Sequence, residues 1–447
     1  MWRRISTVLR PSLSSFLNRK VHTGSRRRFV ALWGNGDYGR LGLGSLQSQW
    51  TPTACRAFDD ECPRAVACGG AHTLFLTEKG RVFATGLNDY GQLGVASEQN
   101  YVLEPLEVSG FSSKIIQVAA GFYHSAAITV DGELYMWGNN SSGQLGLGKR
   151  ANSRISAPTK VDSLGGLSIK MVALGSEHSI ALTDLGHLLS WGAGGSGRLG
   201  HGHRSNIMGL FRSSSEYTPR LIKEFEGLKV QKIAAGLLHS VCINEQGSVF
   251  AFGERTVEKL GFSQSKNATL PSLVNELPSC EEVACGGYHT CVITRDGELY
   301  AWGSNENGCL GIGGTYVAQS PERVEGLFLK LHVTQVTCGW KHTAAICGGR
   351  IFTWGWGGSH GTFSDHGYSS GGQLGQGNDV DYYEPTEVKL GENVRALQVS
   401  CGFNHTGLDF DPSRAPFVKL ACVILAVSIS VTRAGSGFSE GARSTRG

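Results

Sequence analysis

One pattern recurs along almost the whole of this 447-residue sequence. A histidine followed by Ser or Thr returns every 50 to 63 residues, at His72, His124, His178, His239, His289, His342 and His405. An aromatic-Gly pair returns in the same way, at Trp33, Trp137, Trp191, Phe252, Trp302 and Trp354, and one copy has Thr85-Gly86 in its place. A repeat of this length indicates small structural units that stack side by side, because one unit alone cannot bury a core.

Each copy predicts short β-strands separated by tight turns. In the first complete copy we expect strands at residues 65–68, 73–77, 81–85 and 105–108, with Glu78-Lys79-Gly80 as a hairpin turn. A sheet of four short strands leaves two faces uncovered, and copies arranged around an axis cover both. The sequence therefore predicts an all-β protein with the β-propeller fold.

The two ends of the repeat region are incomplete in opposite ways. The first copy opens at Phe29 directly on a third-strand sequence, and the last copy, residues 394–410, contains His405 but no Trp-Gly half. Each end supplies what the other lacks. We therefore predict that residues 29–410 form a seven-bladed β-propeller, with one blade shared as a strand clasp between the N- and C-terminal segments.

The two segments outside the repeats differ from the repeats in composition. Residues 1–28 carry eight basic and no acidic residues, with apolar residues spaced for one helical face. This composition is typical of a mitochondrial transit peptide and predicts location in the mitochondrial matrix; a basic arm for DNA or for nuclear import is the alternative. Residues 411–447 diverge from the repeat, and we expect them to be disordered. Their apolar run at 420–431 is too short to cross a bilayer, so no membrane insertion is expected.

Charge and cysteine content narrow the classes of function. Residues 411–447 add five basic and two acidic residues, so residues 29–410 carry a net charge of about −7 and do not suit a general polyanion binder. The twelve cysteines contain no CxxC pair, and the four that precede a repeat glycine are expected at small apolar core positions: Cys68, Cys285, Cys338 and Cys401. We expect no metal, no cofactor and no catalytic residues.

The seven motif histidines are expected to be structural. One histidine per blade, in register, spreads them around the propeller rather than gathering them in one site. A buried imidazole that bonds neighbouring backbone is therefore the preferred interpretation over a ligand role. The sequence Gly34-Asn-Gly36-Asp-Tyr-Gly39 matches a dinucleotide-binding fingerprint, but it is a copy of the repeat turn and has no βαβ context.

Binding residues are predicted in the loops between the third and fourth strands, which emerge on one face. Three of these loops are elaborated: two are basic and belong to adjacent blades, and one carries an insertion. Two basic loops side by side suggest a site for phosphate or an acidic partner, although ordinary surface variation is the better explanation of any single loop. The candidate partner-binding residues are Lys149, Arg150, Arg154, Arg204, Arg212, His360 and Asp365.

The repeat unit Gly-x-x-His-[Ser/Thr] … Trp-Gly-x-Asn-x-x-Gly-Gln-Leu-Gly resembles that of the regulator of chromosome condensation family, over residues 29–410. The resemblance implies a seven-bladed propeller. The family includes an exchange factor for the nuclear GTPase Ran, a plant UV-B photoreceptor, and organelle-targeted plant members linked to mitochondrial gene expression, which this sequence resembles most. The photoreceptor uses repeated Gly-Trp-Arg-His-Thr motifs; only residues 339–343 approach this motif here, with no adjoining tryptophan expected, which argues against photoreception.

Two functional hypotheses follow from the resemblance and the N-terminal segment. The first is a non-enzymatic mitochondrial scaffold that supports RNA processing, such as intron splicing of respiratory complex I transcripts, or ribosome assembly. Its partners would be mitochondrial proteins, with RNA or a ribonucleoprotein. The second is a guanine-nucleotide exchange factor for an organelle or Ran-like small GTPase, which fits the alternative of a nuclear location. The first hypothesis is preferred because the sequence shows no catalytic constellation and resembles the organelle-targeted plant members of the family most.

Overall fold

The computed structural model describes residues 28–412, apart from 59–60, 98, 203–214, 255–267, 327, 329–330, 359–370 and 392–393. The predicted segments 1–28 and 411–447 thus lie outside the described residues, except for Arg28, Asp411 and Pro412. None of the helices in the described part is long and apolar enough to cross a lipid bilayer.

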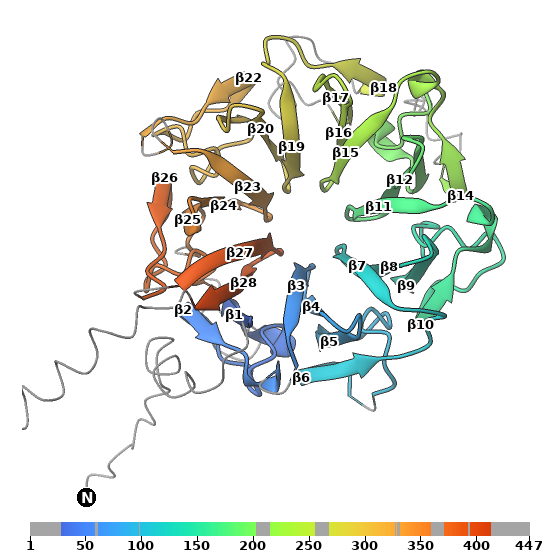
Figure 1. The fold of residues 1–447 in the computed structure, drawn as a ribbon, viewed down its shortest axis with the longest axis horizontal. Coiled ribbons are helices and arrows are strands. Elements are labelled where there is room, and N and C mark those ends of the chain that lie inside the picture. Colours follow the sequence, from blue (N-terminus) through green and yellow to red (C-terminus); the bar gives the residue numbers. More distant parts are fainter. Residues whose placement is uncertain are drawn as a thin grey trace, which may run out of the picture.

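Seven four-stranded antiparallel sheets surround a central axis as the blades of a propeller (Figure 1). The predicted fold class is confirmed. From the inside outward, the strands of blade 1 are β3 (Pro63–Cys68), β4 (His72–Thr77), β5 (Val82–Leu87) and β6 (Tyr101–Val108). Those of blade 2 are β7 (Ile115–Ala120), β8 (His124–Thr129), β9 (Leu134–Asn139) and β10 (Arg154–Lys160). Those of blade 3 are β11 (Ile169–Leu174), β12 (His178–Thr183), β13 (Leu188–Gly192) and β14 (Glu216–Leu221).

Blades 4 to 6 repeat the same order. Their strands are β15 (Val230–Ala235), β16 (His239–Asn244), β17 (Val249–Gly253) and β18 (Ala268–Leu273); β19 (Cys280–Cys285), β20 (His289–Thr294), β21 (Leu299–Gly303) and β22 (Ala318–Arg323); and β23 (Val333–Cys338), β24 (His342–Cys347), β25 (Arg350–Gly355) and β26 (Tyr382–Glu387). Short 3-10 turns connect some of the strands, at η1 (Asp37–Gly39), η2 (Arg56–Phe58), η3 (Asp162–Leu164), η4 (Gly195–Gly197) and η5 (Lys223–Phe225).

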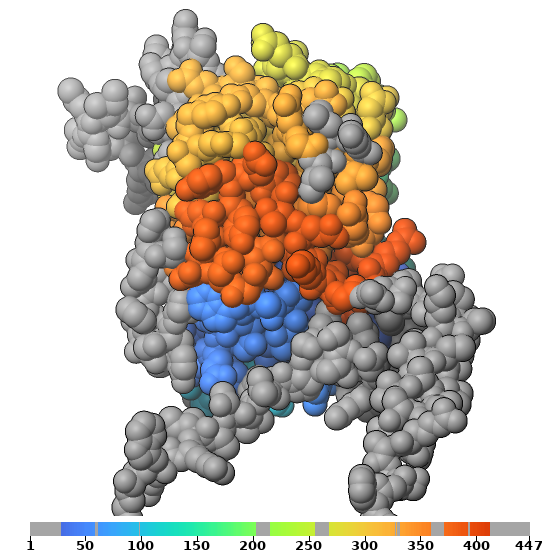
Figure 2. Space-filling view, turned by 90° about the vertical axis from the view of Figure 1, so that its left-hand side faces the viewer, coloured from blue at the N-terminus to red at the C-terminus, as the bar shows by residue number. Residues whose placement is uncertain are grey.

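Blade 7 is built from both ends of the chain. Its sheet order is β2 (Gln49–Ala54), β1 (Phe29–Gly34), β28 (His405–Pro412) and β27 (Val394–Cys401). The pairing of β1 with β28 is continuous from Phe29 opposite Phe410 to Gly34 opposite His405. In Figure 2 the N-terminal segment, in blue, lies directly against the C-terminal segment, in orange-red. The predicted clasp is therefore present.

The core lies between neighbouring blades. Every residue is buried in the second strands β4, β8, β12, β16, β20 and β24, because both faces of each strand are covered by adjacent blades. The tryptophans of the aromatic-Gly motif are fully buried at the end of the third strands: Trp33, Trp137, Trp191, Trp302 and Trp354. Apolar area removed from water between the blades, at roughly 25 cal/mol per Å², is what holds the propeller together.

The glycine of the aromatic-Gly motif is required by backbone conformation and by space. In all seven copies this glycine has a φ between 102° and 122°, which favours glycine over residues with a Cβ. A Cβ at Gly86 would also lie 2.5 Å from the Ala71 carbonyl oxygen and 2.6 Å from the His72 Cα. The motif thus brings the end of the third strand against the turn that precedes the histidine.

We expect the clasp to decide whether the propeller closes. Deleting residues 394–410 removes β27 and most of β28, so β1 loses its pairing with β28 and the faces of blades 1 and 6 are exposed. The deletion should abolish cooperative unfolding and make the chain sensitive to limited proteolysis. Deletion of residues 1–27 is the control and should leave both properties unchanged. Cooperative unfolding of the 394–410 deletion at the wild-type midpoint would contradict the shared blade.

Candidate functional site

Each motif histidine bonds the next blade. Its Nε2 lies 2.9 to 3.2 Å from the hydroxyl of the Ser or Thr that follows the histidine of the next blade. The seven pairs are His72–Ser125, His124–Ser179, His178–Ser240, His239–Thr290, His289–Thr343, His342–Thr406 and His405–Thr73. The last pair joins blade 7 to blade 1, so the bonds form a closed His–hydroxyl circle around the axis.

The direction of these bonds follows from the hydroxyls. Ser125 Oγ donates its only proton to the Gln92 carbonyl at 2.7 Å, and five further hydroxyls of the circle donate to the corresponding carbonyls. A hydroxyl that has used its proton can only accept, so the imidazole donates from Nε2–H. The expected backbone partner of the histidine is replaced by the hydroxyl of the next blade, and this hydroxyl itself bonds the backbone carbonyl.

The same carbonyl explains the recurrent tryptophan. Gln92 O accepts from Trp137 Nε1 at 2.9 Å as well as from Ser125, and Gln144, Cys309 and Gln373 each accept from one hydroxyl and one indole. Both lone pairs of a buried carbonyl are thus used. In these four copies the residue before the Leu-Gly pair is therefore linked to both the hydroxyl and the tryptophan of the following blade.

The glycine three residues before each histidine is set by space. A Cβ at Gly69 would lie 2.5 Å from the His72 Cε1 and 2.6 Å from the Gly121 carbonyl oxygen of the next blade. Gly121, Gly175, Gly236, Gly286, Gly339 and Gly402 stand in the same relation to their own histidines. None of these glycines has a positive φ, so close approach alone accounts for them.

The circle is chemically inert. Burial lowers the pKa of His72, His124 and His342 to about 3, because a charged imidazole would lose its hydration. Burial also raises the pKa of the Cys68 thiol to about 12 and that of Cys401 further, so neither is a nucleophile at neutral pH. These groups serve the fold and do not form a proton-transfer or nucleophilic site.

One group of metal-ligating side chains does come together in space. The ligand atoms of His289, Cys291 and Cys338 lie within 4.8 Å of one another and are buried. Sequence reasoning missed this group because Cys338 belongs to the next blade. His289 Nε2 is already bonded to Thr343 at 2.9 Å, and no fourth ligand joins the group among the described residues. We therefore assign no metal.

The loops between the third and fourth strands emerge on one side of the disc, which we name the loop face. The turns between the first and second strands lie on this same side. The opposite side, which carries the turns between the second and third strands, is the turn face. The turns between the first and second strands surround a central cavity of about 100 Å³, lined by three consecutive residues of every blade, such as Cys68, Gly69 and Gly70 in blade 1. The loop face thus combines the cavity with the loops that the sequence analysis selected.

The structure describes three of the seven predicted binding residues. Lys149 and Arg150 lie exposed in the loop between β9 and β10, and Arg154 is the exposed first residue of β10. Lys149 Nζ lies 6.0 Å from the centre of the Tyr217 ring, and Arg154 Nη2 donates to the Asn88 carbonyl at 3.5 Å. Among the described residues no carboxylate forms an ion pair with these three cations. Arg204, Arg212, His360 and Asp365 lie outside the described residues.

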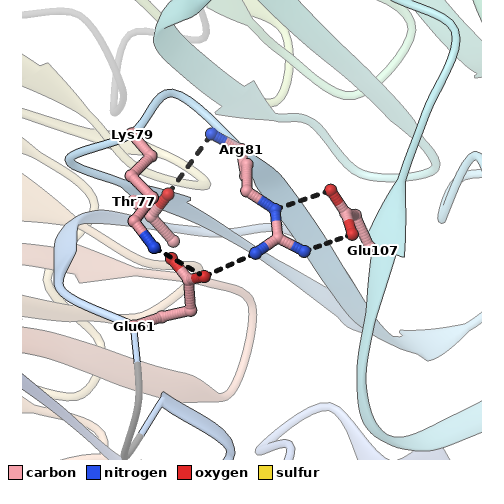
Figure 3. A network of polar contacts seen from close by, with 5 residues as sticks. All are labelled: Glu61, Thr77, Lys79, Arg81 and Glu107. Atoms are coloured by element: carbon pink, nitrogen blue, oxygen red, sulfur yellow. Dashed lines mark hydrogen bonds and ion pairs between the residues drawn. The ribbon is translucent and has the colours of Figure 1, made fainter.

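Several charges on the turn face, by contrast, are paired. Arg81, before β5, binds both oxygens of Glu107 in β6 and reaches Glu61 Oε1 at 2.5 Å; Lys79 also contacts Glu61 (Figure 3). Equivalent cross-strand pairs join the third and fourth strands of other blades, with the signs reversed in two of them: Lys160–Glu133, Arg323–Glu298 and Arg350–Glu387. Lys149, Arg150 and Arg154 on the loop face have no such cross-strand carboxylate partner among the described residues.

The RCC1-like domain model matches residues 29–408. The chain belongs to the RCC1-like domain family. The ultraviolet-B receptor UVR8 of Arabidopsis thaliana is 33% identical over 365 residues, covering 80% of this chain and 77% of the receptor. The mitochondrial RCC1 domain-containing protein RUG3 of the same plant is 34% identical over 290 residues, 63% of each chain. The match thus spans less than two thirds of RUG3.

Solved structures share the fold. Human WBSCR16 superposes with a TM-score of 0.75 at 25% identity and covers 87% of this chain and 100% of its own. Prp20p of Saccharomyces cerevisiae, described with its binding to Gsp1p and histones, has a TM-score of 0.74 at 23% identity and covers 91% and 96%. The predicted family and the seven-bladed architecture are both confirmed.

The expectation that no second tryptophan adjoins Trp340 is wrong. The ring centres of Trp340 and Trp356 lie 5.9 Å apart, with the planes at 89°. Trp356 stands two residues after the buried Trp354, where the chain leaves β25 at the loop face. Both tryptophans belong to blade 6, so the pair does not reproduce a motif repeated on neighbouring blades.

We expect the circle to make stability fall at acidic pH. The pKa of each histidine is lower in the folded chain than its ordinary value of about 6.5, so unfolding takes up protons as the pH drops below that value. Stability should be constant above about pH 7 and decrease below about pH 6.5, by up to about 1.4 kcal/mol per pH unit for each histidine. The variant His342→Gln keeps an N–H donor but does not titrate. The dependence of its unfolding free energy on pH should therefore be smaller than that of the wild type by the contribution of one histidine.

The measurement is urea unfolding between pH 4 and 8. His332→Gln is the control, because His332 stands outside the circle, and its slope should match the wild type. An unchanged slope in His342→Gln would contradict the neutral circle.

Proposed function

We propose that this chain is a non-enzymatic mitochondrial scaffold that supports organelle gene expression, through RNA processing such as intron splicing of respiratory complex I transcripts, or through ribosome assembly. The similarity to the mitochondrial protein RUG3 carries the proposal. The composition of residues 1–28, predicted as a transit peptide, agrees with it. The buried neutral histidines and high-pKa thiols favour a scaffold over an enzyme.

The loop face is the proposed binding surface of this scaffold. Lys149, Arg150 and Arg154 stand there without ion pairs among the described residues. Four turn-face cations, in contrast, are neutralised by cross-strand carboxylates: Arg81, Lys160, Arg323 and Arg350. On a propeller with a net charge of about −7, these unpaired cations would bind phosphate groups of RNA or an acidic protein surface. Arg204, Arg212, His360 and Asp365 remain part of the proposal on sequence grounds.

A second candidate is nucleotide exchange on an organelle or Ran-like small GTPase, with a nuclear location as the alternative. The fold shared with Prp20p, which binds Gsp1p, is the observation that favours it. At 23% identity this likeness concerns the fold alone. The scaffold remains the preferred proposal because the similarity to the mitochondrial protein RUG3, at 34% identity, is stronger than this likeness of fold.

Affinity purification from mitochondria tests the scaffold directly. The tagged full chain should enter the organelle. A variant with Arg3, Arg4 and Arg10 changed to Glu should not be imported, because transit peptides depend on positive charge. RNA-processing or ribosome-assembly proteins, with organelle RNA, should co-purify. Accumulation in the nucleus, or a GTPase as the sole partner with accelerated GDP release, would contradict the scaffold and favour the second candidate.

The basic loops should contribute to partner binding and not to stability. Changing Lys149, Arg150, Arg154, Arg204 and Arg212 to Ser should shift the unfolding free energy by only about 0.5 kcal/mol per site, as substitutions outside cores and caps typically do. Binding to the purified partner should weaken, and with RNA the salt dependence should fall by roughly one unit per lost phosphate contact.

Matched controls lie on the turn face. Lys114, Lys170 and Lys229 are exposed near the starts of inner strands, and their change to Ser should leave binding unaffected. Equal binding by wild type and the loop variant would show that the basic loops are only solvated surface.

A further inference from the structure

Six aromatic side chains form a continuous row across the loop face. The rings follow one another in the order Tyr90, Tyr123, Phe122, Phe403, Trp340 and Trp356, with centres 4.9, 4.4, 5.2, 4.3 and 5.9 Å apart. Trp340 and Phe403 are stacked, with planes at 12°. Phe122, Trp340 and Phe403 also line the central cavity. This set, named the aromatic row, therefore passes over the mouth of the cavity.

Two glycines make room for the row. Phe122, Trp340 and Phe403 occupy one repeat position, the residue after the glycine that packs on the motif histidine; blades 1 and 5 have Gly70 and Gly287 there. A Cβ at Gly70 would lie 2.4 Å from the Phe122 carbonyl oxygen, and a Cβ at Gly287 would lie 2.4 Å from Trp340 Cδ1. Because blade 1 has no side chain at this position, Phe122 can reach Phe403 across it.

The propeller does not need these rings for closure. Blade 3 has Ser176 at the same repeat position and still pairs its strands in the standard order. The row is also partly open to solvent: Tyr90 is 39% exposed and Phe122, Tyr123, Trp340 and Phe403 are half-buried, whereas the five repeat tryptophans are fully buried. The aromatic row thus places on the surface apolar area that the fold leaves uncovered.

Cations lie under and beside the row. The Arg40 guanidinium is buried and donates to the carbonyls of Asp37 and Gly70, at 3.0 and 3.2 Å, but forms no ion pair with any described carboxylate. Arg154 binds the Asn88 carbonyl, two residues before Tyr90. Lys341 lies 5.0 Å from the Trp340 ring centre and is paired with Glu306 at 3.3 Å. Arg40 and Arg154 therefore place positive charge near the Tyr90 end. The carboxylates Asp37 and Asp89 lie in this region but form no ion pair with either cation.

We propose that the aromatic row binds one extended segment of a partner protein, which places an apolar side chain over the cavity mouth and an acidic residue toward Arg40 and Arg154. Trp, Tyr and Arg are the residues enriched at energetic centres of protein interfaces. A cavity of about 100 Å³ has room for a single aliphatic group. A protein is favoured over RNA because the propeller is acidic overall, with a net charge of about −7. The proposal rests on the scaffold function and names the chemistry of its partner.

Peptide selection on the purified full chain provides the test. A random 12-residue display library should yield peptides with an apolar residue flanked by Asp or Glu, and fluorescence anisotropy should give their affinities. Phe122→Ser, Trp340→Ser and Phe403→Ser copy the residue of blade 3, so the fold should tolerate them. Each should weaken binding about tenfold or more, as changes at interface centres do. Arg154→Ser should weaken only the peptides that carry the acidic residue.

The control is Leu185→Ser, since Leu185 is 61% exposed in a turn of the opposite face. It should bind like the wild type, and all variants should keep the wild-type unfolding midpoint. The inference would be overturned if the selected peptides showed no consensus of an apolar and an acidic residue, or if they bound the triple Ser variant as well as the wild type. It would also be overturned if a 12-nucleotide single-stranded RNA bound the protein in a way that depended on the three rings. The assay uses purified protein, so its result is independent of whether the chain functions in mitochondria.

Discussion

The structure depends on seven histidines that remain uncharged in the interior. Each Nε2 bonds a hydroxyl of the next blade, and six of these seven hydroxyls donate in turn to a buried carbonyl. Because the last bond joins blade 7 to blade 1, the circle and the strand clasp close the propeller at the same place. The glycine before each histidine and the tryptophan after it meet the space and hydrogen-bond demands of this one arrangement.

Much of this fold could be predicted from the sequence repeat. The incomplete copies at Phe29 and His405 were enough to predict the shared blade, since a strand sequence without its partner must find one elsewhere. The partner of the histidine was not readable, because the hydroxyl lies in the next copy and only the closed propeller brings the two together. The neighbours Trp340 and Trp356, and the cluster of His289 with Cys338, were missed for the same kind of reason.

The proposed binding surface could be predicted from the sequence only in part. Clustered charge identified Lys149 and Arg150, because loop length and composition stand out against a regular repeat. The aromatic row gave no such signal: Phe122 and Phe403 belong to blades that are not adjacent, and they meet only because Gly70 intervenes. A rigid circle that holds seven short turns around one cavity thus lets distant parts of the sequence build one surface, which is the physical basis of the proposed scaffold.

Nitrogen-15 NMR of the full chain with labelled histidine tests the central claim most directly. The account predicts that all seven motif histidines show the neutral Nε2–H form, with no titration between pH 8 and pH 5. A motif histidine that carries its proton on Nδ1, or that becomes charged within this range while the chain stays folded, would contradict the closed circle.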